Sequence, residues 1–246
     1  GETPPIFGHF PIILGSDRSK LSKRHGALSV LAYRDAGYLP EALLNYVALL
    51  GWSPPDNADC HDLQTIIQTF DLKKITKSGA IFDDQKLRWM NRNYINQLSD
   101  DQDIERVTPF ISQTVNQVLE TQVHQPLIAI HSVRKTLDIL SDINTALSVY
   151  TDSPETVLAR CPVLSDDQVK IIQTVNTQLS HLDNQDESIR SILNHVKQMT
   201  QLPLGLIFKT MRYVVTGIHS GPDLITLLSA FSFEQLAARC QGYLSK

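Results

Sequence analysis

From Ser99 onward the sequence repeats one signal, a helix start followed by an apolar run, and this restricts the chain to mainly α architectures. Three Ser-x-x-Gln pairs, in which the serine caps a helix and the glutamine bonds back to it, precede such runs: Ser99/Gln102, Ser165/Gln168 and Ser232/Gln235. No long alternating strand and no repeat of fixed period interrupts them. The pattern predicts a helix array of two bundles, in which residues 126–140 form one helical run.

The first hundred residues predict a smaller, mixed domain. Residues 4–14 alternate weakly and favour one or two short strands, which end at the turn Gly15-Ser16-Asp17. Pro40 suits the first position of a short buried helix, for which Gly51 can supply a left-handed cap. Asp83 can cap a further helix. We therefore expect a small α+β domain at residues 1–98, followed by all-α subdomains at residues 99–155 and 156–246.

Composition narrows the function classes. The chain has 246 residues and a net charge of −4, with no apolar run long enough for a membrane span and no signal-peptide pattern at its start. Its three cysteines are far apart and its eight histidines lack metal-ligand spacing, which argues against a disulfide framework and a zinc site. Motifs for a P-loop, a nucleophile elbow or a dinucleotide fold do not occur. Because the net charge is negative, any nucleic acid must be bound by local patches of basic residues.

The stretch with the densest set of basic side chains is Lys20-Leu21-Ser22-Lys23-Arg24-His25-Gly26. Two ammonium groups and a guanidinium within five residues suit a loop that holds phosphate, delivered by the strand before it. The alternative for such a run taken by itself is a solvated basic turn.

This stretch and several later segments resemble the second half of bacterial- or organellar-type glutamyl-tRNA synthetase, a class I enzyme. The segments that carry the resemblance are residues 20–26, 33–46, 50–52, 82–83, 86–91 and 94–95, with Thr216-Gly217 and Gly221-Pro222 near the C-terminus. The resemblance covers essentially the whole chain. It implies that residues up to about Leu98 contact the tRNA stem and that the helical remainder binds the anticodon.

In that family the basic loop is the K-M-S-K-S-type motif. The resemblance implies that an ATP-binding loop is formed by Lys20, Leu21, Ser22, Lys23 and Arg24. Lys23 would be the catalytic residue, which contacts the ATP phosphates and stabilises charge as pyrophosphate leaves, with Lys20 assisting. Cations on a closing loop favour that step because they bind the developing charge better than the ground state. ATP and Mg²⁺ are the expected cofactors, without a zinc site.

Four arginines are candidates for tRNA contacts. Arg88 and Arg92 lie one turn apart on a common helix face. Arg212 occupies the arginine position of a family Pro-Leu-Arg motif that here reads Thr-Met-Arg. Some relatives that discriminate between tRNAs read the last anticodon base with an arginine in the segment matching residues 131–136. In this chain Arg134 or Val133 can occupy that position.

The resemblance implies that residues 1–98 hold the end of the catalytic region with the basic loop, together with the stem-contact domain. The family's Rossmann catalytic domain should precede this loop, and its His-Ile-Gly-His-type signature does not occur in this sequence. We therefore expect the parent protein to ligate glutamate to tRNA through glutamyl adenylate, and this chain alone to be inactive. The expected partners of the parent protein are glutamate tRNA, ATP and glutamate, and no membrane is expected to be involved. We expect a monomer in the cytoplasm, or alternatively in a mitochondrial or plastid matrix. The alternative is a free-standing helical interaction module without ligase activity.

Overall fold

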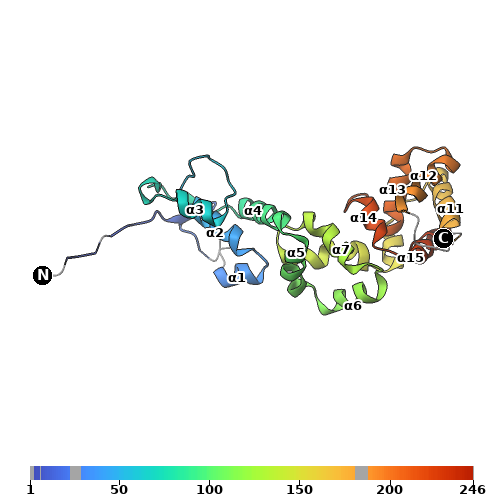
Figure 1. Ribbon diagram of the computed structural model, residues 1–246, viewed down its shortest axis with the longest axis horizontal. Coiled ribbons are helices and arrows are strands. Elements are labelled where there is room, and N and C mark those ends of the chain that lie inside the picture. Colours follow the sequence, from blue (N-terminus) through green and yellow to red (C-terminus); the bar gives the residue numbers. More distant parts are fainter. Residues whose placement is uncertain (1–2, 6, 23–28, 181–187, 246) are drawn as a thin grey trace. The chain divides into compact units, whose positions relative to one another are not determined.

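The computed structural model describes residues 3–5, 7–22, 29–180 and 188–245, and it divides into two compact units (Figure 1). The first unit contains Gly1–Ser99 and Leu137–Ser141, and the second contains Asp100–Thr136 and Asp142–Lys246. The expected subdivision of the helical part after residue 155 stays a prediction. The expected mainly α class, with a small α+β domain at the start, is confirmed.

The first unit combines short helices with a two-stranded parallel sheet. Its elements are β1 (Ile13–Leu14), α1 (Val30–Asp35), α2 (Pro40–Leu49), α3 (Leu63–Thr69), the 3₁₀ helix η2 (Leu72–Lys74), β2 (Ala80–Ile81) and α4 (Asp84–Gln97). Ile13 pairs with Ala80 and Leu14 with Ile81. As expected, Pro40 opens α2, and Asp83 caps α4 by accepting a hydrogen bond from the Lys86 N–H at 3.1 Å. Each of these starts uses a local signal that is visible in the sequence.

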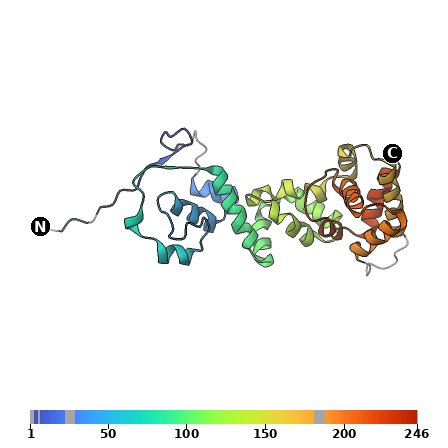
Figure 2. The same ribbon diagram turned by 90° about the horizontal axis from the view of Figure 1, so that it is seen from above.

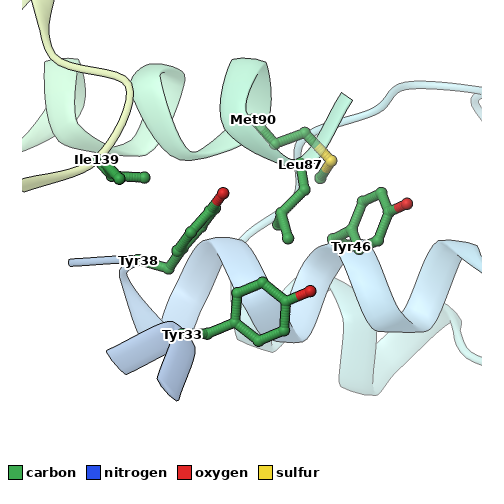
Figure 3. Close-up of a cluster of buried hydrophobic side chains, with 6 residues drawn as sticks. All are labelled: Tyr33, Tyr38, Tyr46, Leu87, Met90 and Ile139. Carbon is green, nitrogen blue, oxygen red and sulfur yellow. The ribbon is translucent and has the colours of Figure 1, made fainter. Parts of the chain in front are cut away.

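The core of the first unit is an aromatic and aliphatic cluster between α2 and α4 (Figure 3). Three tyrosines of α1, α2 and the turn between them face two residues of α4, and Ile139 enters from elsewhere in the chain: Tyr33, Tyr38, Tyr46, Leu87, Met90 and Ile139. The rings of Tyr33 and Tyr38 meet edge to face with centroids 5.1 Å apart. Buried aromatic pairs of this kind contribute beyond the apolar area that they bury.

The segment 137–141 corrects the prediction of one helical run over residues 126–140. The helix α7 ends at Val133, and the chain then passes into the first unit. There the Leu140 N–H donates to the Gly37 carbonyl at 3.0 Å, and the Ser141 hydroxyl donates to the Ala36 carbonyl at 2.8 Å. The apolar residues that suggested a longer helical face are used instead to complete the core of the first unit.

Gly37→Ala is expected to lower the free energy of unfolding of the first unit by about 2–5 kcal/mol, because two penalties add. Gly37 has φ +91°, and a Cβ there would lie 2.7 Å from the Leu140 backbone nitrogen. Gly242→Ala is the matched control, because Gly242 lies inside a helix with nothing within 4 Å of an added Cβ. Urea denaturation measures both, and equal stability of the two variants would contradict the expected close packing.

The left-handed cap expected at Gly51 is wrong. Leu50 caps α2 in the right-handed αR conformation, and the glycines with positive φ are at other positions. The N–H groups of Gly51 and Trp52 both donate to the Ala48 carbonyl, at 3.4 and 3.2 Å, so right-handed turns already satisfy the helix end.

The second unit is built from helices in the part that the structure describes (Figure 2). In chain order they are α5 (Asp100–Val107), η3 (Thr108–Phe110), α6 (Gln113–Gln122), α7 (Pro126–Val133), η4 (Arg134–Thr136), α8 (Ile143–Ala146), α9 (Ser148–Thr151), α10 (Pro154–Arg160), α11 (Asp166–Ser180), α12 (Ile189–Thr200), α13 (Leu204–Thr216), α14 (Leu224–Ser229) and α15 (Phe233–Leu244). The short 3₁₀ helix η5 (Leu140–Asp142) begins in the first unit and ends at Asp142, which belongs to the second. The Ser165/Gln168 and Ser232/Gln235 boxes make both of their reciprocal hydrogen bonds. α11 packs against α12, α13 and α15. Within the described ranges, no helix combines the length and apolar character that crossing a membrane requires.

Candidate functional site

The basic loop starts from a small hairpin that is tied to the strand pair. The Leu21 N–H donates to the Ile13 carbonyl at 2.9 Å, and the Gly15 N–H donates to the Ser19 carbonyl at 2.9 Å. Leu14 pairs with Lys20 as an antiparallel bridge, while its carbonyl accepts from the Phe82 N–H at 2.8 Å. The backbone of the first loop residues is therefore fixed by bonds on both sides of β1.

Lys20, Leu21 and Ser22 are the predicted loop residues that the structure describes. The Lys20 side chain is exposed, whereas Leu21 and Ser22 are half-buried. Lys23 and Arg24 lie outside the described residues, so their roles stay predictions. The structure describes the segment that precedes them, up to Ser22.

A cavity of about 340 Å³ lies beside the loop base, against the first turn of α4. Its lining residues are Gly15, Ser16, Leu21, Ile81, Phe82, Asp83, Asp84 and Gln85. Two carboxylates in this lining make the cavity unsuited to an anion, because like charges repel. The expected role of the loop cations in phosphate binding therefore stays a prediction.

Arg88 and Arg92 both lie on α4 and both form ion pairs. The Arg88 Nε donates to Asp84 Oδ2 at 3.2 Å, one turn earlier on the same helix, and the Arg92 Nε donates to Asp138 Oδ1 at 2.7 Å. Their side chains are still 39% and 46% exposed. Each guanidinium therefore holds local structure and keeps part of its surface accessible to a ligand.

Arg134 and Val133 differ in what they can present to a ligand. Val133 is buried in α7, so its side chain cannot contact a base. Arg134 follows at the end of α7, and its Nη1 donates to Asp100 Oδ1 at 3.1 Å. Of the two alternatives, Arg134 is the one with a side chain that can donate hydrogen bonds.

Asp103 and His131 form a pair next to Arg134 that reasoning from sequence missed. The His131 Nδ1 and Asp103 Oδ2 atoms are 3.1 Å apart, and the Asp103 side chain is 1% exposed. Burial raises the pKa of Asp103, against the opposing effects of the His131 hydrogen bond and the Arg134 charge. In the sequence Asp103 looks like one more acidic residue at a helix start. The only available signal was its three-residue spacing from Asp100.

Arg212 lies on α13, beside the loop that leads to α14. Its Nη1 is buried and has no hydrogen-bond partner among the described residues. Gly221 has φ +138°, and a Cβ there would lie 3.3 Å from this nitrogen. The Asp223 carboxylate has its pKa lowered mainly by the Thr226 N–H hydrogen bond, with a smaller contribution from the Arg212 charge. A buried donor without an acceptor is costly, so this nitrogen is an unusual feature of the second unit.

The signature Thr216-Gly217 fixes the start of this loop. Gly217 ends α13 with φ +72°, and a Cβ there would lie 2.6 Å from the Val157 carbonyl oxygen. The Thr216 hydroxyl donates to the Arg212 carbonyl at 2.8 Å. The glycine is required by both its backbone angle and its close contact with α10.

The remaining groups of interest are metal-binding side chains and thiols. The described part of the chain holds no group of three His, Cys, Asp or Glu side chains placed to bind a metal ion. Burial raises the pKa of the Cys240 thiol to about 12, so this thiol stays protonated near neutral pH.

Comparison with known proteins assigns the two parts of the chain. Residues 2–89 match the family of class I tRNA synthetases (E and Q), catalytic domain, and residues 85–244 match the anticodon binding domain family. The chain is 32% identical to glutamate–tRNA ligase 1 of Fervidobacterium nodosum, and the match covers 100% of this chain and 50% of that protein. It is 33% identical to glutamate–tRNA ligase of Natranaerobius thermophilus, over 100% of this chain and 52% of that protein.

The fold is similar to a crystal structure of a glutamate tRNA ligase from Elizabethkingia meningosepticum in complex with its amino acid. The TM-score is 0.78 at 25% identity, over 99% of this chain and 52% of that one. This chain thus spans about half the length of the curated relatives it matches. Over residues 85–244 the chain therefore belongs to the anticodon binding domain family, and over its whole length it is similar to about half of each glutamate–tRNA ligase that it matches.

Proposed function

We propose that this chain is the tRNA-binding portion of a glutamate–tRNA ligase that joins glutamate to tRNA through a glutamyl adenylate made from ATP. The observation that carries the proposal is the match of residues 85–244 to an anticodon-binding domain, directly after a catalytic-domain match over residues 2–89 that includes the basic loop. Arg212 adds support, since its side chain is only half-buried and lies beside the Thr216-Gly217 signature, where its remaining N–H groups can donate to RNA.

The basic loop contributes cations to the ATP site of the complete enzyme. Lys23 stabilises the charge on the departing pyrophosphate and Lys20 assists, on a loop whose base is fixed by β1 and β2. Magnesium would enter bound to the ATP phosphates, whose oxygens are ligands that this ion prefers.

The helical unit holds the anticodon, and the exposed arginines of α4 contact the tRNA backbone. Arg134 and Arg212 are the proposed base-reading residues, while Arg88 and Arg92 neutralise phosphates. The complete enzyme is proposed to act as a monomer in the bacterial cytoplasm.

Binding of glutamate tRNA by the purified chain tests the proposal. The affinity should fall steeply with salt, as phosphate contacts require, and should exceed that for tRNAs with other anticodons. An unrelated acidic helical protein serves as the control at low salt. Binding no tighter than this control would contradict the proposal and favour a protein-interaction module.

A further inference from the structure

Two pairs of charged residues with the same spacing face each other across α5 and α7. Asp100 and Asp103 are three residues apart on α5, and His131 and Arg134 are three residues apart at the end of α7. Residues at this spacing share one helix face, and the two helices pack together. Arg134 Nη1 lies 3.1 Å from Asp100 Oδ1, and His131 Nδ1 lies 3.1 Å from Asp103 Oδ2 and 4.0 Å from Asp100 Oδ1.

The two carboxylates differ in burial. The Asp103 side chain is 1% exposed and that of Asp100 is 75% exposed. Asp103 Oδ1 has no hydrogen-bond partner among the described residues, so this carboxylate is only half satisfied. A buried carboxylate with one unpaired oxygen carries a large desolvation penalty, so an apolar residue would hold the two helices together with less loss of stability.

The charge of Asp103 acts on the neighbouring cation. Arg134 and His131 both interact electrostatically with this carboxylate. Asp100 adds a direct hydrogen bond from the outer side of the cluster. The guanidinium is therefore held by an exposed carboxylate that it contacts and interacts with the buried Asp103 carboxylate.

We propose that Asp103 and Asp100 are positioning residues that hold the Arg134 guanidinium in the orientation needed to read an anticodon base. This rests on the proposed function, in which Arg134 contacts the last anticodon base. Reading a base edge with the planar fork of a guanidinium requires a fixed orientation, because two parallel hydrogen bonds must align together. The His131 Nδ1 atom lies within 4.0 Å of a carboxylate oxygen of each aspartate, which links the two.

Binding of two RNA hairpins by the full chain tests this assignment. One hairpin carries a glutamate anticodon and the other differs only in the last anticodon base, and the ratio of the two dissociation constants measures discrimination. Asp103→Asn and Asp100→Asn should each lower this ratio by about 3- to 10-fold, the range expected for one coupled charge contact. Asp101→Asn is the matched control, because it removes an exposed charge from the same helical turn and should leave the ratio unchanged.

A double-mutant cycle separates positioning from a structural role. In an Arg134→Ala background, Asp103→Asn should have no further effect on the ratio, whereas a general loss of folding would lower binding in both backgrounds. If Asp103→Asn lowers the melting temperature strongly, the exposed Asp100→Asn variant carries the test. A ratio unchanged in both variants would overturn the assignment alone. A wild-type chain that does not discriminate would overturn anticodon reading by Arg134 and this assignment with it.

Discussion

Lys23→Ala in the complete ligase is expected to lower the turnover number for adenylate formation by about 100- to 1000-fold, with little change in the KM for ATP. The lysine is proposed to meet the pyrophosphate as its negative charge develops, so the lost interaction belongs to the transition state. The loop that carries it starts from a base fixed by the Leu21–Ile13 and Phe82–Leu14 hydrogen bonds. ATP–pyrophosphate exchange measures the effect.

Lys170→Ala is the matched control, because Lys170 is an exposed lysine on α11, in the other unit. Its replacement removes the same charge and should leave exchange unchanged. Lys20→Ala should have an intermediate effect, as an assisting cation. Exchange at the wild-type rate in Lys23→Ala would remove the proposed role, and a change confined to KM would show a contact made equally in the ground state.

Arg212→Met is expected to weaken binding of glutamate tRNA by about 10- to 100-fold without loss of stability, an unusual combination for a half-buried residue. The Nη1 atom is buried and has no acceptor within the described ranges, so removing the guanidinium gives up no internal hydrogen bond there. Methionine keeps the length of the side chain and remains apolar. Filter binding and thermal unfolding of the same preparations measure the two quantities.

Arg190→Met is the control for net charge. Arg190 is exposed on α12 in the same unit, so its loss reduces non-specific attraction by the same charge. The difference between the two variants isolates the specific contact of Arg212. Equal, small effects of both substitutions would contradict base reading by Arg212, and a large drop in melting temperature would indicate a structural role.

Helix starts were predictable because they depend on neighbouring residues. The Asp83 cap, Pro40 at the start of α2 and the Ser232/Gln235 box all form as expected, each through contacts within a few residues. Helix ends were less predictable. The end of α2 needs no left-handed glycine, and α7 stops at Val133 although the apolar pattern continues.

The residues of the candidate site also fall into those that the sequence could predict and those that it could not. The spacing of cations in the basic loop and the Thr216-Gly217 signature are visible in the sequence, and they identified the family. Asp103 could not be recognised as a partner of His131, because the two are 28 residues apart and meet only when α5 packs on α7. The missing acceptor of Arg212 likewise depends on what surrounds it in the folded unit.

The sequence by itself determined the helical character of the chain, its basic loop and its family, because capping, periodicity and motif spacing act over short distances along the chain. Only the tertiary structure decided how residues 137–141 are used. Their apolar pattern fits a helix, but Gly37 leaves room for the Leu140 backbone and Ile139 fills a gap in a distant core. Burial of apolar surface outweighs the local helical preference there, and no short stretch of sequence contains that information.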